Sequence, residues 1–170
     1  MNPALAQARA LLQDVTPLTR DCGQVCGGAC CRSLPGERTG MLLFPGEEAF
    51  YQHRPGYDLL ETETGPLLVC SGVCDRADRP LSCRLFPLLP VLRAEGVKVA
   101  MDARARAACP LAAQGVRGLT DAFVEAVRQV GQLLSRDEGQ RVFLQRLTRE
   151  QDELRALQKQ FSGKGGTGHV

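Results

Sequence analysis

The chain has 170 residues, of which 44% are hydrophobic, and a formal net charge of +2 at pH 7. A chain of this length and apolar content forms one domain, or one domain with an appended segment, with a hydrophobic core of its own. The small net charge and the 5% of aromatic residues exclude the basic, aromatic-rich surface that is typical of nucleic-acid binding. No stretch approaches the roughly 18 apolar residues that span a bilayer, so we expect no membrane partner either.

The first segment, residues 1–15, has too short an apolar run for a secretory signal and no basic leader before that run. We therefore expect the protein in the cytoplasm, where reducing conditions keep thiols free. In that compartment, eight cysteines indicate ligands of a metal or cluster rather than disulfides. A disulfide framework and a set of buried structural thiols are the two alternatives that the even number of cysteines leaves open.

Only short elements are expected in the first hundred residues. Apolar residues at helical spacing predict a helix over 3–15, with Asn2 as its cap. Glu47 and Glu48 occupy the first turn of a short helix through Tyr51, where acidic side chains are favoured. Short apolar runs predict four strands, at 41–44, 67–69, 87–92 and 97–101. The last two flank a Glu-Gly turn and form a hairpin, whose first strand carries two prolines and therefore lies at a sheet edge.

From residue 119 onward the pattern is helical. Apolar spacing predicts a helix over 119–134, capped by Thr120 or Asp121. Ser135 and Glu138 form a capping box that opens a second helix. The apolar face of the second helix consists of Phe143, Leu147, Leu154, Leu157 and Phe161. We expect the two apolar faces to pack on each other as an antiparallel hairpin.

The expected fold is a small, mainly helical α+β domain with a few short strands around a cysteine-bound metal core. Residues 1–118 form the cysteine-cluster domain, and residues 119–161 form the helical hairpin packed on it. Residues 162–170, which are rich in glycine, form a flexible tail.

The eight cysteines carry the chemistry of this chain. They form two groups and one single residue: Cys22, Cys26, Cys30 and Cys31; then Cys70, Cys74 and Cys83; then Cys109. Soft thiolates at this density, with glycines between them, are typical of zinc and iron–sulfur sites. Eight thiolates could fill two closed zinc sites, or could hold one 4Fe–4S cluster and leave spare thiols. All eight are therefore candidate metal ligands, for zinc or for iron.

The first cysteine group lies in a glycine-rich segment, residues 22–32. Its glycines disfavour a continuous helix, although the spacing of the cysteines would place two sulfurs on one helical face. We expect a tight loop that wraps around a ligand. In an extended segment the side chains of Cys30 and Cys31 diverge, so these two would serve different metals, or one of them would not be a ligand.

Four arginines lie close to cysteines in the sequence: Arg32, Arg76, Arg79 and Arg84. Four thiolates on one Zn²⁺ carry a formal charge of about −2, which guanidinium groups would offset while they donate hydrogen bonds to sulfur. We expect Arg84 to support the ligands in this way, and Arg76 to face solvent.

The segments CGQVCGGACCR and CDRADRPLSCRLFP resemble the YkgJ-like cysteine-cluster family, whose members are described as zinc- or iron-chelating proteins. The family pattern falls here on Cys22, Cys26, Cys30, Cys31, Cys74, Arg79, Pro80, Cys83, Arg84, Phe86 and Pro87. Two residues usually separate the first cysteines in that family, whereas three separate them here. The family includes a longer flagellin lysine methylase, but no segment here is typical of S-adenosylmethionine binding, so the resemblance implies chelation more strongly than methylation.

Three classes of function fit this sequence. The interpretation we favour is a structural metal in a small cytoplasmic binding module. The alternatives are a redox or transfer enzyme that depends on a metal or iron–sulfur centre, and a metal chelator or delivery factor. The expected partner is a metal ion, and a protein partner stays open. His53 and His169 are expected in solvent, and no nucleophile–base pattern is present, so whether the protein is an enzyme stays open as well.

Overall fold

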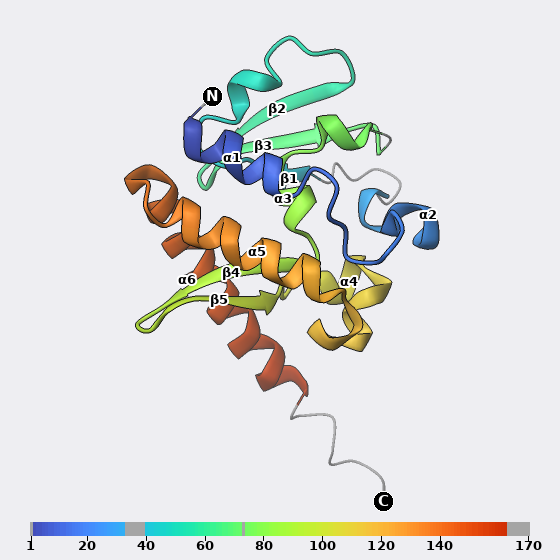
Figure 1. Cartoon of the computed structure of the whole chain (residues 1–170), viewed down its shortest axis with the longest axis vertical. Helices are drawn as coiled ribbons and strands as arrows, with labels where there is room; N and C mark the ends of the chain where they lie inside the picture. The colour runs from blue at the N-terminus through green and yellow to red at the C-terminus, as the bar shows by residue number, and fades with distance from the viewer. Residues whose placement is uncertain (1, 33–39, 73, 163–170) are drawn as a thin grey trace, which may run out of the picture.

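The computed structural model describes residues 2–32, 40–72 and 74–162 and places them in an α+β fold (Figure 1). Its helices are α1 (Pro3–Leu11), α2 (Cys22–Cys26), α3 (Leu81–Leu85), α4 (Ala105–Ala108), α5 (Asp121–Leu134) and α6 (Glu138–Ser162). Its strands are β1 (Gly40–Leu42), β2 (Tyr57–Thr62), β3 (Gly65–Cys70), β4 (Leu88–Arg93) and β5 (Gly96–Met101). The predicted class, a helical α+β domain with short strands, is confirmed.

The strands form two small antiparallel sheets. The first sheet has the order β1–β3–β2, and the second is the β4–β5 hairpin. Strands β1 and β3 and the β4–β5 hairpin were predicted and are confirmed, with somewhat different bounds. Strand β2 was not predicted, because polar residues such as Asp58 and Glu61 interrupt any apolar run. Its pairing along the whole of β3 defines it instead.

Helix α1 begins as predicted, because the Asn2 side chain accepts a hydrogen bond at 2.8 Å from a backbone N–H of the first turn. It ends at Leu11, earlier than predicted. The carbonyl oxygens that follow are bound by Arg76, whose guanidinium donates to Leu12 and Val15 at 3.0 and 2.7 Å. The prediction that Arg76 faces solvent is therefore wrong, since its guanidinium binds the backbone of the segment that follows α1.

The N-terminal cap of α5 is the predicted residue, whereas that of α6 is a different one. Thr120 caps α5, as predicted, by accepting a hydrogen bond at 3.3 Å from the first turn. Helix α6 is capped by Asp137, which accepts from the N–H of Gln140 at 3.0 Å. The predicted capping box of Ser135 and Glu138 is wrong, because the Ser135 hydroxyl donates to a carbonyl of α5 instead.

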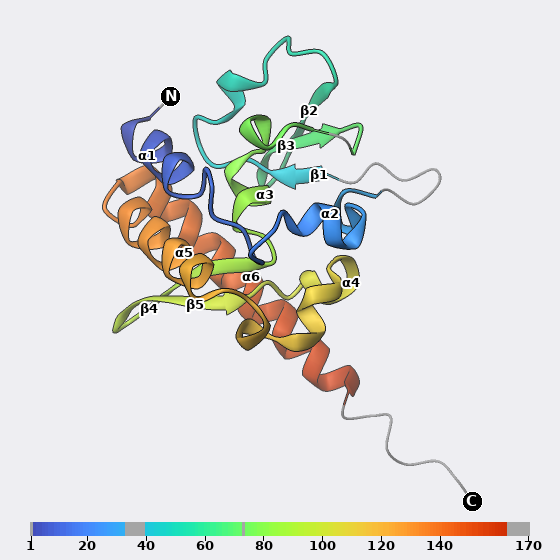
Figure 2. The ribbon, with the colours of Figure 1, turned by 45° about the vertical axis from the view of Figure 1, so that its right-hand side comes forward.

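Helices α5 and α6 each pack more extensively against the β4–β5 hairpin than against each other (Figure 2). Helix α5 approaches both strands so closely that a Cβ at Gly131 would lie 2.6 Å from Pro90 and 2.7 Å from Val97. Helix α6 follows β4, where the Leu92 N–H donates to the Thr148 hydroxyl at 3.0 Å. The two apolar faces share the main core, as the predicted hairpin requires, but the β4–β5 hairpin supplies more of their partner surface than either helix does for the other.

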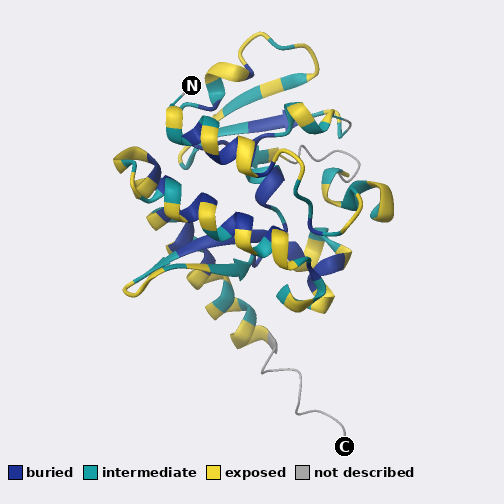
Figure 3. Cartoon of the chain, in the orientation of Figure 1, coloured by how far each residue is buried: buried dark blue, intermediate teal, exposed yellow. Residues whose placement is uncertain are grey.

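The main hydrophobic core joins helices from both ends of the chain (Figure 3). It includes Leu5 of α1, Leu85 of α3, Leu88 of β4, Phe123 of α5 and Leu144 of α6. A smaller cluster beside the three-stranded sheet consists of Leu43, Tyr51 and Leu68. The helices after residue 119 thus share one core with the first helix.

The apolar face of α6 is shorter than predicted. Leu147 is buried, but Leu154, Leu157 and Phe161 are 37, 48 and 75% exposed. Beyond Leu147 the buried position is taken by Gln151, whose amide donates to the carbonyl of Met101 at the end of β5 at 2.6 Å and accepts from the N–H of Ala103 at 2.8 Å. The second half of α6 is therefore anchored by polar contacts, which include the ion pair between Asp152 and Arg93 of β4.

The end of the chain differs from the prediction by one residue in the described part. Helix α6 continues to Ser162, so Ser162 belongs to the helix and not to the predicted tail. The rest of that predicted tail, residues 163–170, lies outside the described residues. Among the described residues, no helix is both long enough and apolar enough to cross a membrane.

Candidate metal centre

The first cysteine group lies on one helical turn and one 3₁₀ turn. Helix α2 places Cys22 and Cys26 one turn apart on the same face, and Asp21 caps it by accepting an N–H at 3.0 Å. Gly27 and Gly28, at φ 61° and 68°, take the left-handed conformation that ends the helix. The prediction that no continuous helix forms here is confirmed. The expected loop is wrong, because α2 makes about half of the segment helical.

Cys30 and Cys31 lie side by side. Both belong to the 3₁₀ turn η1 (Ala29–Cys31), and their Sγ atoms are 3.9 Å apart. The prediction that the two side chains diverge is wrong, because it assumed an extended backbone. Two thiolates that bind one tetrahedral zinc at about 2.3 Å each lie about 3.8 Å apart. The pair is therefore spaced as two ligands of one ion would be.

The later cysteines come from three further segments. Cys70 ends β3, Cys74 lies in the following loop, Cys83 is in α3, and Cys109 directly follows α4. The loop after β3 touches the first group through its backbone: Gly72 has φ +81°, and a Cβ there would lie 2.8 Å from the carbonyl oxygen of Cys31. Glycine at this position thus allows the two cysteine groups to meet.

Seven of the eight cysteines line a single cavity of about 450 Å³: Cys22, Cys26, Cys30, Cys31, Cys74, Cys83 and Cys109. The elements that carry them, α2, α3 and the end of α4, gather on one side of the molecule (Figure 2). Cys70 is not among the lining residues. The apolar part of the wall includes Met41, Phe86 and Leu111. Segments that are far apart in sequence therefore bring their thiols to one hollow.

The cavity does not hold a closed set of ligands. All eight cysteines are free thiols. Among the described residues, no group of three or more His, Cys, Asp and Glu side chains is placed so that it could hold a metal ion. The donor atoms suit zinc or iron, and the Cys30–Cys31 spacing fits a shared ion.

Arg79 is the guanidinium most closely tied to the thiols. It lines the cavity and lies 3.5 Å from the Asp21 carboxylate, and the nearby Cys74 thiol contributes to raising its pKa. Its Nε is buried and finds no hydrogen-bond partner among the described residues. A buried donor without a partner is costly, so this N–H is available to an anionic group in the cavity.

Arg84 supports the cavity from behind. Its guanidinium donates to the carbonyl oxygens of Arg9, Ala77 and Arg79, at 3.1, 2.8 and 2.9 Å. The expectation that Arg84 assists the ligands by hydrogen bonds to sulfur is therefore corrected, since these hydrogen bonds go to backbone oxygens. Arg84 acts on the site by holding the turn that carries Arg79.

A buried ion pair that the sequence did not reveal positions Cys83. Glu47 is completely buried, pairs with Arg9 of α1, and accepts a hydrogen bond at 2.7 Å from the N–H of Leu81, the first residue of α3. Burial raises the pKa of Glu47 although the Arg9 guanidinium opposes that shift. The prediction placed Glu47 in the first turn of a short helix. The sequence pattern there does not distinguish a buried acidic side chain from an exposed one.

The thiols of the cavity differ in the direction of their pKa shifts. Burial raises the pKa of Cys22 and of Cys74, and it raises that of Cys83 well above the usual range. The hydrogen bond between the neighbouring thiols lowers the pKa of Cys31 and raises that of Cys30. The first proton of this pair is therefore lost more readily than the second.

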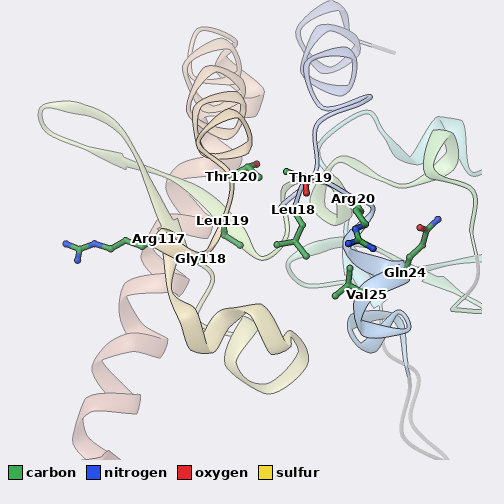
Figure 4. Close-up of a pocket in the computed structure, with 9 residues that line it drawn as sticks. All are labelled: Leu18, Thr19, Arg20, Gln24, Val25, Arg117, Gly118, Leu119 and Thr120. Carbon is green, nitrogen blue, oxygen red and sulfur yellow. The ribbon is translucent and has the colours of Figure 1, made fainter.

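A second hollow, of about 620 Å³, lies against the outer face of α2 (Figure 4). It is lined by Leu18, Thr19, Arg20, Gln24, Val25, Arg117, Gly118, Leu119 and Thr120. None of these described residues is a cysteine, and Gln24 lines both hollows. This groove therefore borders the thiol cavity without sharing its chemistry.

The chemistry of the candidate centre is defined by its own residues. Seven thiols, three guanidinium groups and one carboxylate line the cavity. The guanidinium groups belong to Arg32, Arg79 and Arg104, and the carboxylate to Asp21. Comparisons of the chain with protein-family models, with curated proteins and with solved structures found no match.

Proposed function

We propose that the chain is a metal-binding protein whose thiol cavity holds zinc or iron, the latter as an ion or as a 4Fe–4S cluster. The observation that carries the proposal is the convergence of seven cysteines from four separate segments on one cavity. Thiols select a soft metal as the occupant of such a site.

The charges around the cavity support the same proposal. Four thiolates on a divalent ion leave a net charge of about −2, which must be offset where solvent is excluded. Three arginines against one aspartate line the cavity. The unpartnered Nε of Arg79 supplies a donor to a metal-bound sulfur, as surrounding groups do in thiolate sites.

The metal would be structural in this proposal. Cys74 and Cys83 on one side, and Cys31 with Cys22 or Cys26 on the other, are the residues we assign as ligands. A bound ion would supply a crosslink between the two cysteine groups. The resemblance of the cysteine pattern to the YkgJ-like family agrees with chelation.

The experiment is purification without oxygen, followed by an absorption spectrum and elemental analysis of metal per chain. We expect zinc or iron in wild type, and a clear loss in Cys74→Ser and Cys83→Ser. Cys70→Ser is the matched control, because Cys70 does not line the cavity, and it should keep the metal. Full metal content in both cavity variants would contradict the proposal. An iron–sulfur absorption band would distinguish a cluster from zinc.

A further inference from the structure

Cys30 and Cys31 are neighbouring thiols, one of which is open to solvent. Their Sγ atoms lie 3.9 Å apart, and Cys30 is exposed while Cys31 is partly buried. A disulfide needs an S–S distance of about 2.05 Å, so the two sulfurs are not bonded to each other. Their separation instead suits two sulfurs that bind one atom lying between them. A small molecule in solvent reaches this pair directly, through Cys30.

The turn that carries the pair is held by its backbone. The Cys31 N–H donates to the carbonyl oxygen of Gly28 at 2.8 Å. The Arg32 guanidinium donates to the carbonyl oxygen of Gly27 at 3.0 Å. The Cys31 carbonyl lies against Gly72, where a Cβ would be 2.8 Å away. Because these contacts fix the turn, less conformational freedom is lost when one ligand binds both sulfurs.

We propose that Cys30 and Cys31 form a two-thiol binding site for trivalent arsenicals, such as arsenite. Trivalent arsenic is a soft centre, which thiols bind in preference to oxygen donors. A closed zinc site needs four donors. Among the described residues, no group of three or more His, Cys, Asp and Glu side chains is placed to hold a metal ion. An arsenical needs only the two sulfurs of this pair, because its third bond stays with an oxygen or carbon substituent.

The inference goes beyond the proposed metal and does not rest on it. Cys31 is one of the ligands assigned to that metal, so a metal and an arsenical would compete for its sulfur. Cys30 is not among those ligands, and its exposure makes it the first sulfur that an arsenical meets. The second bond, to Cys31, then forms within the same molecule and is favoured by the high effective concentration of the neighbouring thiol.

The reaction is a ligand exchange in which arsenic stays trivalent. Arsenite, As(OH)₃, forms one As–S bond with each thiol. Two As–O bonds break, and the two hydroxyl groups leave as water with the two thiol protons. The third hydroxyl group remains on arsenic. No oxidant or reductant is required, and each bond formed replaces a bond broken.

The test measures binding of phenylarsine oxide in the presence of excess glutathione. A single thiol of the protein loses the arsenical to this competitor, whereas a pair retains it. Elemental analysis and intact mass give arsenic per chain, for the protein as purified and after removal of metal by chelation. We expect about one arsenic per chain, and binding that is weaker by about a hundredfold or more in Cys30→Ser and in Cys31→Ser.

Two further variants are the controls. Cys70 does not line the cavity, and Cys26 belongs to the other close pair of the segment, one helical turn from Cys22. Cys70→Ser and Cys26→Ser should both retain arsenic as wild type does. Wild-type retention in Cys30→Ser and Cys31→Ser, or loss in Cys26→Ser alone, would overturn the inference, and so would a lack of retention by wild type in both preparations. Metal analysis of the same samples tests the proposed metal separately, since the chelated protein needs no zinc or iron to hold arsenic.

Discussion

Arg9 and Glu47 form an ion pair that is closed to solvent and joins α1 to the start of α3. The same arginine donates to the carbonyl oxygen of Ala77 at 3.2 Å, and Arg84 donates to that oxygen from the other side. Two guanidinium groups thus meet on the turn between the cysteines of the second group. The turn that carries Arg79 is therefore bound by a charged network that contains no cysteine.

Removing one partner of this pair should be costly. Glu47→Ala leaves the Arg9 guanidinium buried without its counter-ion, so we expect a loss of about 3–5 kcal/mol in the free energy of unfolding. The double variant Arg9→Met/Glu47→Leu removes both charges and should recover most of that loss. Chemical denaturation of the variants measures both values. A loss as large in the double variant as in Glu47→Ala would show that the pair is not the cause.

Metal removal should loosen the two cysteine segments selectively. Complete chelation should increase amide hydrogen exchange in residues 22–31 and 70–83, because those turns contain few large apolar residues. Helices α5 and α6 should stay protected, since their buried faces lie in the main core. Equal exchange in the cysteine segments before and after removal would contradict a structural metal.

The packing of α6 predicts unequal effects of two equivalent truncations. Leu147 is 5% exposed in the main core, so Leu147→Ala should lower the free energy of unfolding by about 2–5 kcal/mol. Leu157 is 48% exposed on the same helix, and Leu157→Ala should change it by less than about 0.5 kcal/mol. Thermal and urea denaturation of the pair test this difference. Similar losses would mean that the second half of the helix is covered in solution.

The close contact between Gly72 and the Cys31 carbonyl predicts that a side chain at Gly72 is more harmful than one at a glycine with no neighbours. Alanine at Gly72 would place its Cβ 2.8 Å from the Cys31 carbonyl oxygen, so we expect lower stability and a lower metal content. Gly96 also has positive φ, +117°, but no atom lies within 4 Å of its Cβ position. Gly96→Ala should therefore show only the backbone strain, of about 1–2 kcal/mol, with normal metal content. Equal metal loss in both would assign the effect to strain alone.

The cap of α6 predicts a pH-dependent contribution to stability. Hydrogen bonds from Asn2 and from the N–H of Gln140 lower the pKa of Asp137 below its ordinary value. Because the folded pKa is the lower one, the contribution is present above the unfolded pKa and is lost as the pH falls through the folded pKa. The stability difference between wild type and Asp137→Ala should therefore shrink on acidification. Paired denaturation curves between neutral pH and about pH 3 measure it, and a difference that stays constant would exclude a titrating cap.

Local patterns in the sequence were sufficient for the elements whose residues interact with near neighbours. The Asn2 cap, the β4–β5 hairpin and the buried face of α5 follow from turn chemistry and apolar spacing within about fifteen residues. The suitability of the cysteines for a soft metal also follows from the sequence, because it depends on the sulfur atoms alone.

Long-range placement was decided by the tertiary structure. No local pattern distinguishes Glu47, which is buried against α1, from Glu48 beside it. None shows that Arg76 binds the backbone after α1, more than sixty residues away in the sequence. The convergence of seven thiols and the omission of Cys70 likewise depend on how α2, α3 and α4 pack. Periodicity shows which face of an element is apolar. The partner of that face, and the partner of each buried charge, is determined only by the tertiary packing of distant segments.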